Sequence, residues 1–175
     1  MFTKQYTSLK VILYGALMVV CYLLQSVPAL KLRFMGNAPE LLLVLTIGVA
    51  YFESATFSAF FGLFAGLLND IITDSIVGKS ALFFMFAAFI ISLLLQTLLR
   101  DFFLTYIFIS LGTLLLFLLL EYLLNLVFFG IADFGTALLK VILPKLFFSG
   151  LLAYPVFYVL RKMSEKLWPG GDGVN

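Results

Sequence analysis

The sequence contains no histidine and few charged residues: Asp, Glu, Lys and Arg together make up 11% of its 175 residues. Without histidine there can be no serine–histidine pair and no H-E-x-x-H zinc site, and the commonest general base is missing. A soluble domain has about a quarter of its residues charged, so that class is excluded. The net charge of +2 is too small and too dispersed to indicate a nucleic-acid-binding protein.

An internal disulfide is excluded as well, because Cys21 is the only cysteine. What the chain has in abundance is apolar side chains. They make up 63% of the residues, and the mean hydropathy is +1.16. These values predict an all-α integral membrane protein whose surface is covered by lipid.

Apolar runs separated by polar residues predict six spans in one transmembrane domain, 1–168, at about 9–27, 40–52, 55–72, 80–99, 102–129 and 142–160. The first run has no small-residue cleavage site after it and is expected to be retained as a span. Residues 169–175 are expected to form a flexible C-terminal tail.

The stretch from Glu40 to Ile72 is predicted to fold as a hairpin. As one helix it would be about 50 Å long, whereas the hydrocarbon core of a bilayer is about 30 Å thick. A turn at Glu53 and Ser54 places the glutamate charge at an interface instead of mid-membrane. Each half is then short, so neighbouring helices must shelter it or the bilayer must thin.

Lysine and arginine set the expected orientation. The side that carries both termini holds Lys4, Lys10, Arg100, Arg161, Lys162 and Lys166, and the opposite side holds Lys31, Arg33, Lys79, Lys140 and Lys145. The basic clusters near both ends predict that both termini are cytoplasmic. Four acids are then expected on the outer side: Glu40, Asp70, Asp74 and Asp133.

Two short patterns are similar to parts of catalytic motifs but lack their partners. Ser149 in "FFSG" has no base to activate it. Asp133 in "GIAD" lacks a partner aspartate in a second span, because the remaining aspartates lie in predicted loops or at span ends. No G-x-x-x-x-G-K-[ST] phosphate loop occurs. We therefore predict that the chain is not an enzyme and uses neither a cofactor nor a metal.

Small residues form a stripe on the third predicted span, at Ala59, Gly62 and Gly66. Gly62 and Gly66 make a G-x-x-x-G pair, which allows another backbone to approach closely. Packing within the chain's own bundle and contact with a helix of another protein both explain this stripe. Our hypothesis is that it packs against the membrane helix of a partner.

Polar residues follow at the outer end of the same span. Asp70 and Asp74 lie one helical turn apart, and Asn69 precedes them. Two carboxylates and one amide are too few ligands for a well-defined hard cation. These residues are either solvated turn residues or a cap, and our hypothesis is that Asp70 fixes the adjoining outer turn.

Glu121 lies deep in the fifth predicted span, and Asn125 shares its helix face. A glutamate within a span is expected to face protein or a wet cavity. It could bind a cation, carry a proton, hold a partner helix or bond to Asn125. We favour an internal structural bond over a transport role.

The stretches "APELLLVLTIGVAYFES" and "FFGLFAGLLNDIITDSIVGKSALFFMFAAFI" resemble the rod shape-determining protein MreD family. The likeness covers about Ala38 to Ile91 and rests on three elements. They are the Pro-Glu-leucine run (Pro39, Glu40, Leu41, Leu42, Leu43), the G-x-x-x-G-L-x-x-D element (Gly62, Gly66, Leu67, Asp70), and the following turn (Val77, Gly78, Ala81, Leu82). Lys79 departs from the family, which often has an apolar or small residue there.

The resemblance implies a non-enzymatic, multi-pass subunit of the bacterial cytoplasmic membrane that acts in cell elongation and maintains rod shape and side-wall peptidoglycan synthesis. The implied direct partner is MreC, with MreB, RodA and the elongation transpeptidase in a larger complex. The family's six-helix layout resembles the substrate-binding subunits of energy-coupling-factor transporters. A vitamin-type solute-binding subunit is therefore the alternative, with Asp70, Asp74 and Glu121 as polar contacts and a lid at 29–38.

Overall fold

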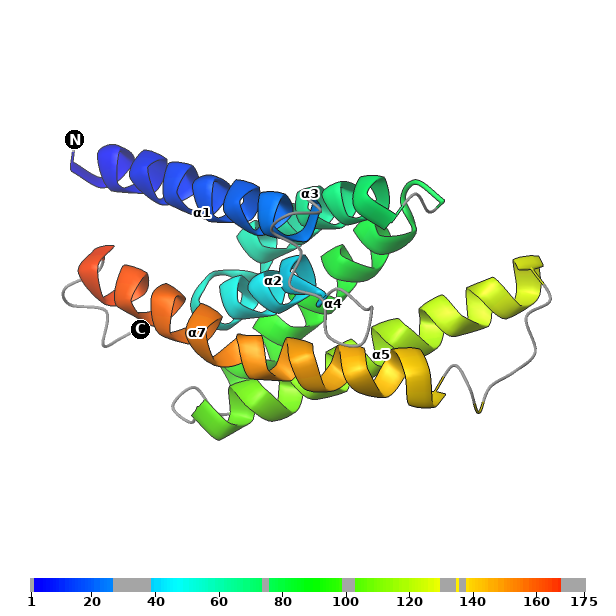
Figure 1. The fold of residues 1–175 in the computed structure, drawn as a ribbon. Helices are drawn as coiled ribbons and strands as arrows, with labels where there is room; N and C mark the ends of the chain where they lie inside the picture. The colour runs from blue at the N-terminus through cyan, green and yellow to red at the C-terminus, as the bar shows by residue number, and fades with distance from the viewer. Residues whose placement is uncertain are drawn as a thin grey trace.

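The computed structural model describes residues 2–26, 39–73, 76–98, 103–129, 135 and 138–167, and the side chains of these residues from 10 to 164 except those at 96–98, 103–104, 125 and 128–129. The described residues form α-helices α1 (Phe2–Ser26), α2 (Leu41–Phe52), α3 (Ala55–Thr73), α4 (Lys79–Leu98), α5 (Phe103–Phe129) and α7 (Leu143–Leu167), and a π-helical segment, η1 (Leu138–Ile142), that runs into α7 (Figure 1). The tail, Asp74 and the proposed lid lie outside the described residues.

Three described helical stretches are long and apolar enough to cross a membrane: Ala55–Thr73, Thr105–Leu124 and Leu138–Ser164. Stretches Lys10–Ser26, Leu41–Phe52 and Lys79–Leu95 are apolar but shorter. Large apolar side chains on α1, α4, α5 and α7 point out of the bundle, among them Ile12, Phe86, Phe108 and Phe147. Exposure of this extent is typical of a lipid-facing surface, and together these features indicate a membrane protein.

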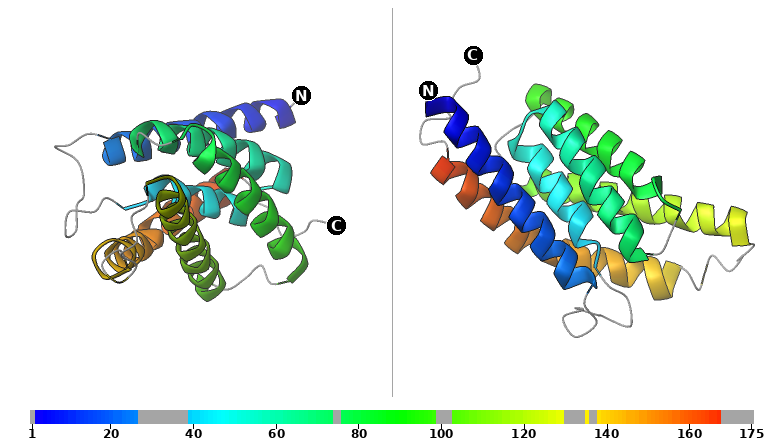
Figure 2. Two further views of the ribbon diagram at one scale, coloured as in Figure 1. Left: turned by 90° about the vertical axis from the view of Figure 1, so that its right-hand side faces the viewer. Right: turned by 90° about the horizontal axis from the view of Figure 1, so that it is seen from above.

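Helix α2 is the centre of the bundle. Its residues from Leu41 to Tyr51 are all buried, and α1, α3, α4, α5 and α7 all contact it. Figure 2 shows it enclosed between the longer helices. A helix that is apolar on every side has no face for water and must be covered by other helices or by lipid. The shelter expected for this short half of the hairpin is thus provided by the rest of the chain.

Aromatic rings fix α2 against α5 and α7. The Tyr51 ring packs edge-on against Tyr106 at a centroid distance of 5.9 Å and against Phe157 at 5.7 Å. Tyr106 and Phe157 are themselves 4.7 Å apart. The Tyr106 hydroxyl also donates a hydrogen bond of 3.4 Å to the carbonyl of Val44. Such aromatic pairs contribute more stability than the burial of their apolar area alone would give. They therefore fix the positions of α2, α5 and α7 relative to one another.

The chain turns between α2 and α3 at Glu53 and Ser54, where the sequence analysis places the hairpin. Glu53 pairs with Lys10 of α1 at 2.7 Å, and the Tyr14 hydroxyl donates to its carboxylate at 2.9 Å. The Ser92 hydroxyl of α4 donates to the Glu53 carbonyl at 2.8 Å. The turn therefore lies at the same end as the beginning of α1, where α7 also ends (Figures 1 and 2).

The glycine pair of α3 packs against α4 of the same chain. A Cβ atom at Gly62 would lie 2.6 Å from the carbonyl oxygen of Phe84, and one at Gly66 would lie 2.5 Å from that of Ser80. Both distances are far below an ordinary contact, so only glycine allows this approach. Of the two explanations for the stripe, this contact supplies packing within the chain's own bundle, because α4 occupies the glycine face. Ala59, on the same helix, is partly buried.

Candidate functional site

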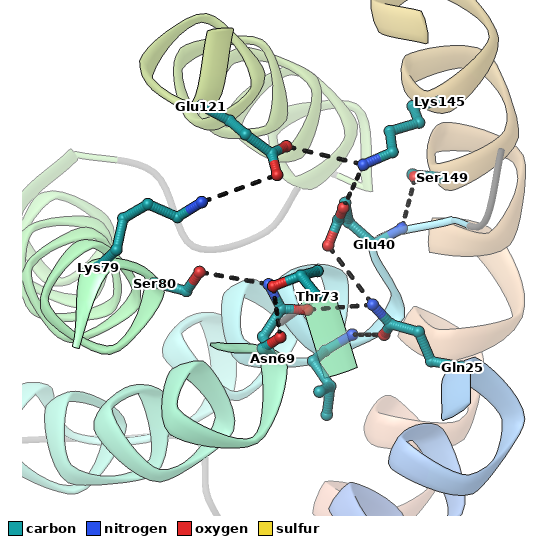
Figure 3. Close-up of polar contacts among 10 residues, drawn as sticks. Gln25, Glu40, Asn69, Thr73, Lys79, Ser80, Glu121, Lys145 and Ser149 are labelled. Carbon is teal, nitrogen blue, oxygen red and sulfur yellow. Dashed lines mark hydrogen bonds and ion pairs between the residues drawn. The ribbon is translucent and has the colours of Figure 1, made fainter. Parts of the chain in front are cut away.

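A cluster of polar side chains lies at the end of the bundle opposite the Glu53 turn. There α1 and α3 end, and α2, α4 and α7 begin (Figure 3). Helices α1, α3, α4, α5 and α7 each contribute at least one member, and Glu40 lies directly before α2. The polar cluster is defined by Gln25, Glu40, Asn69, Asp70, Lys79, Ser80, Glu121, Lys145 and Ser149.

Gln25 connects three helices at the centre of the polar cluster. Its amide nitrogen donates to Asn69 at 3.0 Å and lies 3.5 Å from the Glu40 carboxylate. Its amide oxygen accepts from the backbone N–H of Leu42 at 3.4 Å. Asn69 in turn donates to the Ser80 hydroxyl at 3.3 Å. Because buried polar groups are costly unless they are hydrogen-bonded, this chain of bonds fixes how α1, α2, α3 and α4 meet.

Asp70 joins the end of α3 to the start of α4. Its carboxylate accepts hydrogen bonds from the backbone N–H of Gly78 at 2.7 Å and of Ser80 at 2.9 Å. Unpaired N–H groups at a helix N-terminus favour an acceptor with negative charge. Gly78 has φ of +98°, a conformation that suits glycine. The structure thus places Asp70 in contact with the turn between α3 and α4.

Glu40 is 2% exposed, so its carboxylate needs a close partner. The Lys145 ammonium donates to it at 2.8 Å, and the pairing offsets the cost of burying either charge. The Glu40 backbone N–H donates to the Ser149 hydroxyl at 3.0 Å. Ser149, the isolated serine of "FFSG", is therefore a hydrogen-bond acceptor that fixes the entry into α2.

Glu121 lies between two lysines from different helices. Its two carboxylate oxygens are 3.8 Å from the Lys79 ammonium and 3.7 Å from the Lys145 ammonium. Figure 3 shows both lysines directed at this carboxylate from opposite sides. The side chain of Asn125 lies outside the described residues, and the partners that the structure gives to Glu121 are these lysines.

The polar cluster is a network of hydrogen bonds and ion pairs that connects the helices. Among the described residues, no three His, Cys, Asp or Glu side chains come together in a group that could hold a metal ion. Most cluster members are satisfied by one another or by backbone groups. The exception in geometry is the set of Lys79, Glu121 and Lys145, whose ion pairs are longer than hydrogen bonds.

Sequence reasoning found only part of this cluster. Asn69, Asp70 and Glu121 stand out in the sequence as polar residues of apolar spans, whereas no pattern there predicts a bonding role for Gln25, Ser80 or Lys145. The available signal was a polar side chain at the boundary of an apolar run, as at Gln25 near the end of the first predicted span. That signal does not reveal partners, and Lys145 and Glu40 are 105 residues apart in the chain.

Comparison of this chain with protein-family models, with curated proteins and with solved structures gives no match in any of the three.

Proposed function

We propose that this chain is a non-enzymatic subunit of the bacterial cell-elongation complex, of the rod shape-determining MreD type. In this role it binds MreC in the cytoplasmic membrane and, with MreB, RodA and the elongation transpeptidase, maintains rod shape and side-wall peptidoglycan synthesis. The observation that carries the proposal is the residue resemblance over 38–91, and above all its glycine–aspartate element at Gly62, Gly66 and Asp70.

The position of this element in the fold supports a scaffolding role. Gly62 and Gly66 bring α3 onto the backbone of α4, and Asp70 fixes the turn between them. All three residues thus serve the rigidity of one helical hairpin. A protein that acts by holding neighbours in place needs such a rigid surface, whereas a catalyst needs an activated group, and the sequence has no histidine to activate one.

In this proposal all six α-helices cross the bilayer, in the layout of energy-coupling-factor substrate-binding subunits, and both termini are cytoplasmic. The short helix α2 crosses inside the bundle and needs no lipid-facing length of its own, because its neighbours surround it. The exposed apolar faces of α1 and α5 carry Ile12, Val19 and Phe108 and remain available to lipid or to the MreC helix.

Depletion in a rod-shaped bacterial host tests the proposal. Loss of the protein is expected to make cells round up, and the wild-type chain is expected to restore rods and to recover MreC on affinity purification. Lys162→Gln, which removes an exposed charge far from the polar cluster, serves as the matched control and is expected to rescue fully. Cells that stay rod-shaped but lose uptake of a vitamin-type solute would instead support the transporter alternative.

A further inference from the structure

Glu121 is held less tightly than the other two carboxylates of the polar cluster, and with its partners Lys79 and Lys145 it is here named the charged triad. The Asp70 carboxylate receives hydrogen bonds of 2.7 and 2.9 Å, and Glu40 receives one of 2.8 Å. By contrast, Glu121 meets its two lysines at 3.8 and 3.7 Å. These separations exceed the N–H···O range of about 2.7–3.2 Å, so the triad can admit additional hydrogen-bonding atoms.

The charged triad is also partly exposed at the surface of the bundle. The side chains of Lys79, Lys145 and Glu121 retain 12%, 14% and 19% exposure, whereas that of Glu40 retains 2%. An ammonium has three N–H donors and a carboxylate about four acceptor positions. The ion pairs use only part of this capacity, so the remaining donors and acceptors can face a small polar group.

Charge balance restricts what that group can be. Among the four side chains that these ion pairs connect, Lys79 and Lys145 supply two positive charges and Glu121 and Glu40 supply two negative charges, so the four sum to zero. An anion would add an uncompensated negative charge beside two carboxylates. A cation would add an uncompensated positive charge beside two lysines. A zwitterion adds no net charge and offers a partner to both signs at once.

An apolar stripe begins beside the charged triad. Leu82, Phe86 and Ile90 follow Lys79 on α4 at helical spacing and are 56%, 57% and 52% exposed. Residues three or four apart lie on one face of a helix. A molecule whose polar head binds Lys79 can therefore lay an acyl chain along these side chains, which favours a lipid over a free solute.

We propose that the charged triad binds the headgroup of a phospholipid that carries a phosphate and a primary amine, the chemistry of phosphatidylethanolamine. The phosphate oxygens accept hydrogen bonds from the two lysines, and the ammonium donates to Glu121. The acyl chains lie along Leu82, Phe86 and Ile90. This inference does not depend on the role in cell elongation.

Native mass spectrometry of the purified protein with three synthetic lipids tests the proposal. Phosphatidylethanolamine has N–H donors for Glu121. Phosphatidylcholine has the same net charge but no N–H donor, and phosphatidylglycerol has a negative charge without an amine. We expect the first-lipid binding constant of phosphatidylethanolamine to exceed that of the other two by about tenfold, the effect of one charge-assisted hydrogen bond.

Two variants connect this preference to the charged triad. Glu121→Gln removes the negative charge and is expected to abolish the preference for phosphatidylethanolamine over phosphatidylcholine. Lys79→Gln is expected to weaken binding of all three lipids several-fold. Lys162→Gln removes the same charge from an exposed position near the other end of α7 and is expected to change nothing.

Equal constants for phosphatidylethanolamine and phosphatidylcholine in the wild-type protein would overturn the proposal, even if no variant folds. A preference that survives in folded Glu121→Gln would overturn it as well. The last measurement is the binding of free phosphoethanolamine, which has the same headgroup but no acyl chains. If it binds as tightly as the lipid, the acyl stripe contributes nothing and the assignment to a lipid is wrong.

Discussion

Replacing Gly66 with alanine is the sharpest test of the fold, because the change adds a single carbon atom where the backbones of α3 and α4 are in close contact. A Cβ there would lie 2.5 Å from the carbonyl oxygen of Ser80, whereas an ordinary contact begins near 3.4 Å. The obstacle is backbone, so no side-chain rotation relieves it. Helices α3 and α4 must therefore separate locally by about 1 Å, a clash of the kind that costs about 1–3 kcal/mol.

The separation of α3 from α4 also weakens a second contact between them. Asp70 holds the N–H of Ser80 at 2.9 Å, and an increase of about 1 Å would take that bond beyond hydrogen-bonding range. For a chain of this length, we expect the thermal midpoint of Gly66→Ala to fall by about 3–10 °C. Circular dichroism of the detergent-purified protein measures this midpoint, and size-exclusion chromatography confirms that the sample is folded at the starting temperature.

Gly112→Ala is the matched control. A Cβ at Gly112 meets nothing within 4 Å, and exchanging glycine for alanine within a helix stabilises by about 0.5–1 kcal/mol. We therefore expect opposite signs for the same chemical change. Equal midpoints for the two variants would refute the tight α3–α4 contact. A fully stable Gly66→Ala protein that no longer recovers MreC would place the glycine pair at a partner interface after all.

Three further outcomes follow from the hydrogen bonds and from the proposed topology. Asp70→Ala leaves two backbone N–H groups at the start of α4 without an acceptor, and we expect a loss of about 3 kcal/mol in thermal unfolding. Tyr14→Phe removes one bond to Glu53 and is expected to cost about 1 kcal/mol, so an unchanged midpoint would contradict that contact. Fusions at the two termini are expected to give fluorescent green fluorescent protein and inactive alkaline phosphatase, and active phosphatase at either end would disprove cytoplasmic termini.

The arrangement of α2, α3 and α4 was largely predictable because polar residues mark where they end. No end of these three helices differs from its predicted position by more than one residue. The predicted stretches are 40–52, 55–72 and 80–99, and the helices are Leu41–Phe52, Ala55–Thr73 and Lys79–Leu98. The C-terminal helix was less predictable. It continues to Leu167, past the predicted end at 160, because the long side chains of Arg161 and Lys162 can keep their charges in a polar region while the backbone stays helical.

The partners within the polar cluster could not be predicted from sequence. Which face of each helix points inward depends on the packing of all the others, and the apolar residues of α2 give no facial pattern, since every side is buried. The bonds among Gln25, Asn69 and Glu40 arise only once α1 and α3 are placed on α2. The glycine pair showed that a close contact exists, but spacing alone left open which helix makes it.

The burial of α2 has a consequence for biogenesis. At 12 residues, it is about 18 Å long, too short to be recognised alone as a stop or start signal during insertion, which takes about 20 apolar residues. In the proposed six-span topology it therefore depends on its neighbours to enter the bilayer, and Glu53 stays on the side that carries the beginning of α1. Lys10, made earlier, is then already in place to receive that carboxylate, so the order of translation matches the order in which the central helix acquires its neighbours.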